Sequence, residues 1–235
     1  MGIKEVIEMI NSMQADGVIE RYAIGGAVGA TFYLEPVATL DVDVFVEFHT
    51  EPGSQIASPE PIFKFLHDRG CPMENKHVVI AGWPVQFLPA GSPLLQEALA
   101  TAVEKDVDGT PARVFTAEHI AAVALETGCA KDKARVLQFI EAGARSRTVT
   151  TNPRAPWFGW RLAAIRATVP KAKMKLDRTR VPESKRAFRR QLAALPIAEK
   201  LRMLDALRVR TLAIRRASIS GATKKAVVQE APPDR

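Results

Sequence analysis

The chain has only two cysteines among its 235 residues, and it has no stretch of about 18 apolar residues. Cys71 and Cys129 lie far apart, so the sequence predicts no disulfide framework and favours a reducing compartment. Without a long apolar stretch, no membrane span is predicted. The amphipathic, partly acidic start of the chain is not typical of a signal peptide. We therefore expect a cytoplasmic protein without a membrane partner.

Positive charge is scarce in the first part of the chain and concentrated in the second. Residues 1–143 hold 10 Lys or Arg and 20 Asp or Glu, a balance of −10. Residues 144–235 hold the remaining 23 basic and 6 acidic residues, a balance of +17, which gives the net +7 of the whole chain. We predict a domain over residues 1–143 and a basic helical extension over residues 144–235. The asymmetry predicts a polyanionic partner or contact between the two regions.

Hydrophobic patterning in the first region alternates between the periods of helices and strands. Apolar residues at helical spacing predict a helix over residues 3–13, and alternation predicts a strand over residues 40–48. Two hairpins are predicted, one turning at residues 81–82 and the other at the Asp-Gly pair 108–109. Further helices are expected over residues 27–34, 61–69, 92–103, 116–126 and 131–142. These elements predict an α/β (α+β) fold, in which helices flank a mixed β-sheet.

The segment from Tyr22 to Phe48 contains the main candidate site. Gly25 and Gly26 stand at a turn from a strand into a short helix, where backbone N–H groups can approach phosphate oxygens. Asp41 and Asp43 are two residues apart on the next strand, so both carboxylates face one side and can converge on Mg²⁺ or Mn²⁺. We predict the aspartates as metal ligands and catalytic residues, and the glycines as nucleotide-binding residues. Alternatively, the aspartates lie on the solvated face of an edge strand.

The order strand, Gly-Gly, short helix and Asp-x-Asp strand resembles the nucleotidyltransferase fold of DNA polymerase β relatives. It is most similar to abortive-infection-type toxins and minimal nucleotidyltransferases, with Gly25 and Gly26 matching the first part of the motif and Asp41 and Asp43 the second. The resemblance covers roughly residues 5–143. It implies transfer of a nucleoside monophosphate from an NTP to a hydroxyl of RNA or protein, with two divalent ions. It also implies a toxin–antitoxin-like role.

The helix expected over residues 131–142 also resembles the family, whose corresponding helix starts with a Lys-Asp pair. Lys131 and Asp132 match that pair. Lys131 is therefore a candidate nucleotide-binding residue, because a cation near an acidic metal site neutralises phosphate charge. A solvated helix start explains the lysine equally well. The preceding Cys129 is expected in the core.

One position departs from the resemblance. The family has a third carboxylate on a later strand, and the corresponding position here is Gln86, in the stretch WPVQFLP. An amide is a weak Mg²⁺ ligand and cannot act as a general base. Nucleotide binding is therefore better supported than catalysis. The alternative function is a catalytically degenerate nucleotide- or RNA-binding module, acting as an antitoxin or regulator.

The basic extension suggests a second interaction surface. A cluster of Trp157, Phe158 and Trp160 precedes two basic amphipathic helices, which are divided at Pro196 and expected to pack as a hairpin before a frayed tail. Such a surface fits the phosphates of RNA, including tRNA, or a partner protein. The abrupt change of composition also fits a fused antitoxin-like segment. Alternatively, the basic helices neutralise the acidic first region.

Overall fold

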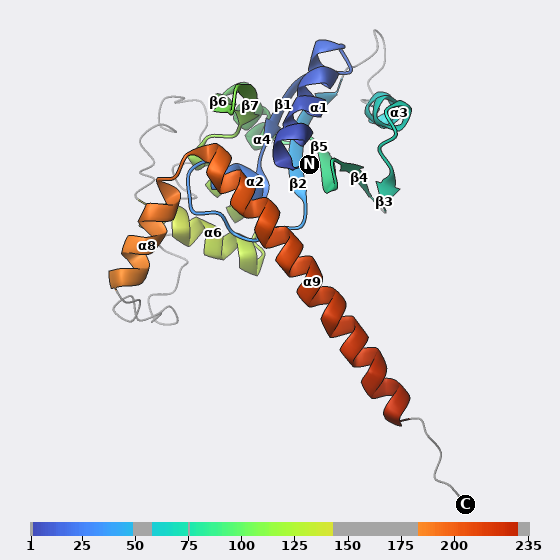
Figure 1. Cartoon of the computed structure of the whole chain (residues 1–235). Helices are drawn as coiled ribbons and strands as arrows, with labels where there is room; N and C mark the ends of the chain where they lie inside the picture. Colours follow the sequence, from blue (N-terminus) through green and yellow to red (C-terminus); the bar gives the residue numbers. More distant parts are fainter. Residues whose placement is uncertain (1, 49–57, 75, 143–182, 230–235) are drawn as a thin grey trace, which may run out of the picture.

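A mixed β-sheet forms the centre of the protein (Figure 1). The computed structural model describes residues 2–48, 58–74, 76–142 and 183–229, with side chains described up to residue 218. Within these residues the sheet has seven strands in the order β3-β4-β5-β2-β1-β7-β6. The strands are β1 (Ile19–Ile24), β2 (Val42–Phe48), β3 (Met73–Glu74), β4 (His77–Ile80), β5 (Trp83–Pro89), β6 (Val103–Val107) and β7 (Thr110–Val114).

The strand directions confirm the predicted mixed sheet. The central strands β1 and β2 are antiparallel to each other. On either side of this pair, β5 runs parallel to β2 and β7 runs parallel to β1. The outer strands are added by antiparallel hairpins, β4–β5 and β6–β7, together with the short strand β3.

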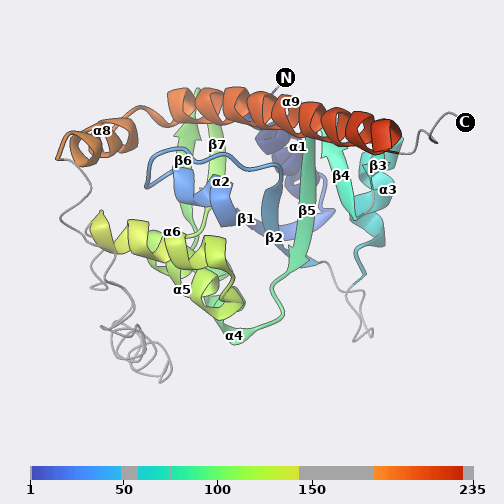
Figure 2. The same ribbon diagram turned by 90° about the horizontal axis from the view of Figure 1, so that it is seen from below.

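Helices surround this sheet. They are α1 (Ile3–Ala15), α2 (Gly26–Thr31), α3 (Glu60–Asp68), α4 (Pro93–Ala100), α5 (Ala117–Thr127), α6 (Ala130–Glu141), α8 (Glu183–Ala193) and α9 (Ile197–Gln229). Figure 2 shows α5 and α6 together on one side, while α9 crosses the sheet at one end of its strands. Among the described helices, none is both long and apolar enough to cross a membrane.

Both predicted hairpins are present, and local backbone geometry explains them. Ala81 and Gly82 have φ values of 49° and 81°, and Asp108 and Gly109 have the same pair of values. A two-residue turn with positive φ at both positions matches the right-handed twist of the flanking strands. Glycine adopts this conformation readily, and aspartate tolerates it better than most residues.

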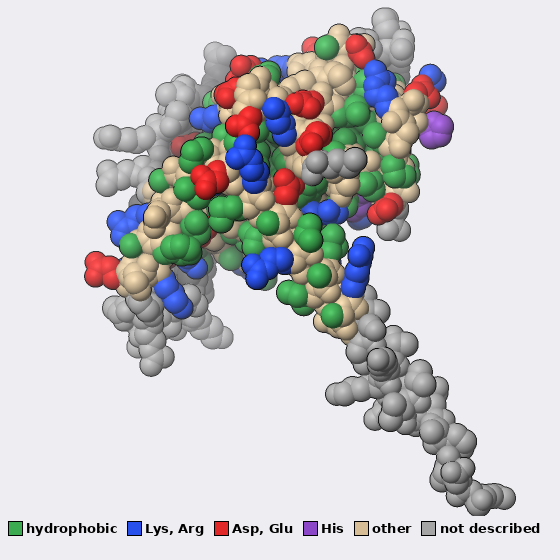
Figure 3. All heavy atoms as spheres, in the orientation of Figure 1, with side chains coloured by type: hydrophobic (Ala, Val, Ile, Leu, Met, Phe, Trp, Pro, Cys, Tyr) green, Lys and Arg blue, Asp and Glu red, His purple; other side chains and the backbone are tan. Residues whose placement is uncertain are grey.

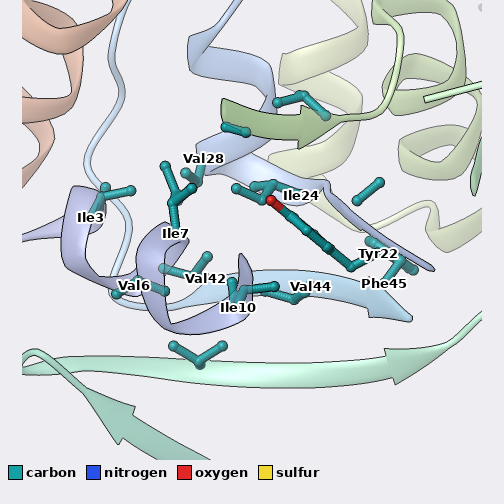
Figure 4. Packing of buried hydrophobic residues seen from close by; sticks show 14 of the residues in the cluster. Ile3, Val6, Ile7, Ile10, Tyr22, Ile24, Val28, Val42, Val44 and Phe45 are labelled. Atoms are coloured by element: carbon teal, nitrogen blue, oxygen red, sulfur yellow. The ribbon is translucent and has the colours of Figure 1, made fainter. Parts of the chain in front are cut away.

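Part of the core lies between α1 and the central strands. Helix α1 buries its whole apolar stripe: Ile3, Val6, Ile7, Ile10 and Met13 are each 0% exposed. Figure 4 shows this stripe close to Tyr22 and Ile24 of β1 and to Val42 and Val44 of β2. Burying a side chain of this size contributes about 1.5–3 kcal/mol. This packing fixes β1 and β2, the two strands from which the candidate site is built.

The C-terminal helices are arranged differently from the expected hairpin. Leu201 and Leu204 of α9 are 3% and 0% exposed and belong to the same hydrophobic core as α1. In Figure 2, α8 leads away from the start of α9 instead of folding back along it. The side of α9 that carries Leu201 and Leu204 is occupied by the first region, so it is not available to α8. The predicted boundary at residue 144 and the aromatic cluster at residues 157–160 lie outside the described residues.

Candidate functional site

The turn between β1 and α2 lies directly against Asp43. Gly26 has φ 56°, and a side chain at this position would collide with the Asp43 carboxylate. A Cβ atom at Gly25 would lie 2.5 Å from Cε2 of Phe45. The Gly25 N–H donates to the Asp43 carbonyl oxygen at 3.0 Å, so this amide is engaged by the sheet. The first-turn amides of α2, which have no partner within the helix, are the donors left at this turn.

Asp41 directly precedes Val42, the first residue of β2, so it lies just outside this strand, although the sequence predicted a strand over residues 40–48. The Thr39 hydroxyl donates to Asp41 Oδ1 at 3.0 Å, and this contact orients the carboxylate. Burial, and after it the negative charge of Asp41, raise the pKa of Asp43 to about 6. The structure thus brings the two carboxylates close enough to interact. A cation bound between them would offset both effects, as expected for a metal site.

Gln86, the residue predicted at the third position, lies on β5 next to β2. In the parallel pair β2–β5, Gln86 lies directly opposite Asp43. Neighbouring strands are about 4.8 Å apart, so the two residues are adjacent. Within the described part of the chain, no group of three or more His, Cys, Asp or Glu side chains could hold a metal ion. The two aspartates, with an amide neighbour, are therefore the candidate donor set.

Helix α6 contributes one charged group, Arg135, that was not assigned from the sequence. The charge of Arg135 lowers the pKa of Asp43 and the charge of Asp132 raises it, so both act electrostatically on that carboxylate. Arg135 Nη1 is also 3.4 Å from Asp132 Oδ1. Lys131, the residue predicted to bind nucleotide, is exposed and forms no hydrogen bond or ion pair with other described residues. Arg135 could have been found from its spacing, because it follows Asp132 by three residues on one helix face.

The expectation of a buried Cys129 is wrong. Cys129 is exposed and precedes the first residue of α6, where its thiol donates to Asp132 Oδ2 at 2.7 Å. Its place on a helical run suggested a core position, but α5 ends before Cys129 because the chain turns at Gly128, which has φ 69°. The cysteine therefore joins the charged start of α6 instead of the core.

The donor set suits a hard cation that carries phosphates. Mg²⁺ binds oxygen ligands and is commonly held by one or two carboxylates together with substrate phosphates and water. Asp41 and Asp43 supply the carboxylates, and the start of α2 supplies backbone donors. A cavity of about 590 Å³ between α6 and α8 is lined by Glu35 and Arg189, among others, but by neither aspartate.

Comparison with known proteins supports the fold. Neither a protein-family model nor a curated protein sequence matches the chain. The structure is similar to an antigenic nucleotidyltransferase-like protein from Paracoccidioides brasiliensis, with 14% identity, a TM-score of 0.51, and coverage of 72% of this chain and 89% of that one. It also aligns with the antibiotic-resistance factor ANT(2'')-Ia, with 16% identity, a TM-score of 0.33, and coverage of 94% and 97%. The first similarity shows a nucleotidyltransferase-like fold, as predicted.

Proposed function

We propose that this protein binds a nucleoside triphosphate together with Mg²⁺ or Mn²⁺ and transfers a nucleoside monophosphate to a hydroxyl group. The contact between Gly26 and the Asp43 carboxylate carries this proposal. It joins a turn suited to phosphate with a carboxylate suited to a divalent cation, and only glycine fits the turn. A solvated edge strand does not account for this contact, nor for the half-buried position of Asp43 in a central strand.

The residues would divide the work of binding. Asp41 and Asp43 would hold the cation through carboxylate oxygens, and the first-turn amides of α2 would donate to phosphate oxygens. Arg135 supplies positive charge near Asp43. When bound, the divalent ion would neutralise charge on the phosphates. The acceptor hydroxyl would have to lose its proton without help from Gln86, because an amide cannot accept it.

A second candidate function is a catalytically degenerate module that binds nucleotide without transferring it. The position of Gln86 beside Asp43 favours this alternative. Such a protein would act as a regulator or an antitoxin, and nucleotide binding would be its readout. Both functions share the same binding site, so they differ only in whether transfer occurs.

Label transfer separates the two functions. The full chain is incubated with labelled NTPs, Mg²⁺ or Mn²⁺, tRNA and cell protein. Transfer that is lost in Asp43→Asn supports the enzyme, whereas saturable NTP binding without transfer supports the degenerate module. If neither binding nor transfer is seen in the wild-type chain, the proposal fails.

The variant Gln86→Asp tests the assignment of the third position. A carboxylate beside Asp43 restores a metal ligand and a proton acceptor, so the transfer rate is expected to rise at least about tenfold. Gln96→Asp is the matched control, because Gln96 is exposed on α4. Unchanged transfer in Gln86→Asp would show that the missing carboxylate does not limit the reaction.

We further propose RNA, with tRNA as the example, as the acceptor or partner. Lys185 and Arg190 of α8 and Arg210, Arg215 and Arg216 of α9 are exposed. Figure 3 shows Lys and Arg side chains along the part of α9 that extends from the body. Neutralising Arg215 and Arg216 together should weaken tRNA binding and reduce its salt dependence. Binding that does not respond to salt would favour a partner protein instead.

A further inference from the structure

The segment that connects α2 to β2, residues 32–41, ends at Asp41 and lies outside the sheet. A side chain of α9 forms a hydrogen bond with the last peptide group of this segment. Arg208 Nε donates to the carbonyl oxygen of Leu40 at 3.3 Å. Since Leu40 directly precedes Asp41, this hydrogen bond acts on the backbone next to the proposed metal ligand.

Arg208 is itself held in a defined orientation. Its guanidinium carbon lies 4.7 Å from the centre of the Trp83 ring, within the range of a cation–π contact. Trp83 is 3% exposed, and its indole N–H donates to Asp205 Oδ1 at 2.7 Å. Asp205 precedes Arg208 by three residues on the same face of α9. Trp83 is also the first residue of β5, the strand that carries Gln86.

The other end of the connecting segment is attached to the same helix. Lys200 is 2% exposed, and its Nζ donates to the carbonyl oxygens of Leu34 at 3.3 Å and Ala193 at 3.1 Å. Lys200, Leu204 and Arg208 follow one another at intervals of four residues, so they form one ridge of α9. Leu204 is fully buried in the core. The helix therefore cannot slide along the connecting segment without exposing apolar surface.

We infer that Arg208 is a positioning residue for the proposed nucleotide site. By holding the Leu40 carbonyl, it keeps the Asp41 carboxylate beside that of Asp43. The inference rests on the function proposed above, because the placement of Asp41 matters only if it binds a cation with its nucleotide. A ligand set has to be held to within about 0.5 Å, and a residue just before a strand has backbone freedom that a strand residue lacks.

The test compares Arg208→Met with Arg202→Ala in the full chain. Methionine removes the donor but keeps an unbranched side chain against Trp83. Arg202 lies on the same helix, is 71% exposed and pairs with Asp108, so it controls for the loss of one positive charge. Two quantities are measured: the Kd for an NTP in the presence of Mn²⁺, and hydrogen–deuterium exchange in the peptide covering residues 35–43.

The Arg208→Met variant is expected to raise the Kd about tenfold and to accelerate exchange in this peptide. Arg202→Ala should change neither quantity appreciably. The variant Arg208→Lys should lie between Arg208→Met and the wild type, because lysine keeps a donor but lacks the planar guanidinium that stacks on the ring. Circular dichroism confirms that each variant is folded at the temperature of the measurements.

Two results would overturn the inference, and they are separate from failure of the proposed function. A Kd in Arg208→Met equal to that of the wild type refutes the positioning role. If the wild-type chain does not bind NTP with Mn²⁺, the proposed function fails. Hydrogen–deuterium exchange then tests only whether Arg208 holds the backbone at Leu40. Unchanged exchange in Arg208→Met refutes this role of Arg208, whereas faster exchange in Arg208→Met but not in Arg202→Ala supports it.

Discussion

Replacing Asp43 by Asn is expected to stabilise the metal-free protein at neutral pH. Burial, together with the charge of Asp41, raises the pKa of Asp43 from the ordinary 3.8 to about 6. The folded state therefore disfavours the ionised carboxylate, while the unfolded chain accommodates it in water. Asparagine removes this charge and keeps a similar shape. A side chain that the proposed function requires for binding would thus lower the stability of the protein that carries it.

The magnitude follows from the difference between the two pKa values. One pH unit corresponds to about 1.4 kcal/mol, so a rise from 3.8 to about 6 lowers the free energy of unfolding by at most about 3 kcal/mol. The size of this penalty depends on pH, but its sign does not. Well below the unfolded pKa of 3.8 both states are protonated and the penalty is absent. It grows as pH rises towards 6, because the unfolded state ionises first, and it is complete once pH is well above 6.

Urea unfolding in the presence of a chelator, at pH 7.5 and at pH 4, measures this effect. Asp43→Asn should be more stable than the wild type by up to about 3 kcal/mol at pH 7.5 and nearly equal to it at pH 4. Asp68→Asn, at a side chain that is 54% exposed and paired with Lys64, should change little at either pH. Added Mg²⁺ with NTP should then stabilise the wild type but not Asp43→Asn.

The reasoning would be refuted if Asp43→Asn were less stable than the wild type at pH 7.5. An equal gain at both pH values would also refute it, because the gain must follow ionisation. The same pKa predicts that binding of Mn²⁺ with NTP weakens as pH falls below about 6, since a protonated Asp43 cannot serve as a carboxylate ligand.

Two further predictions concern single side chains. Gly26→Ala should abolish NTP binding and destabilise the fold by more than Gly17→Ala. Both glycines have positive φ, but a Cβ at Gly26 would collide with Asp43, whereas a Cβ at Gly17 meets nothing within 4 Å. Equal effects of the two variants on the Kd and on the free energy of unfolding would disprove the contact with Asp43. Leu204→Ala should lower the free energy of unfolding by about 2–5 kcal/mol, and Val209→Ala, at a 65% exposed site on the same helix, by less than about 0.5 kcal/mol. Similar urea midpoints for these two variants would mean that α9 does not contribute to the core.

Local patterns in the sequence were sufficient for much of the fold and for part of the site. The period of apolar residues predicts α1, although the helix continues two residues beyond the predicted end. The turns at residues 81–82 and 108–109 were predicted because their positive φ values are a local property of the chain. The segment from Gly25 to Asp43 was predicted for the same reason: its glycine turn, short helix and alternating strand follow one another within about twenty residues.

Contacts between distant segments required the tertiary structure. The sequence indicated Lys131 as the cation near the site, whereas in the structure the charge of Arg135 on α6 lowers the pKa of Asp43. Likewise, composition suggested a separate basic extension, but the buried side of α9 contacts α1 and holds the backbone beside Asp41. Periodicity shows that a helix has an apolar face without showing which surface covers it. The sequence by itself therefore determined the elements and the aspartate pair, whereas only the tertiary structure decided which charged groups and which helix surround that pair, because these contacts depend on how faces far apart in the chain are buried together.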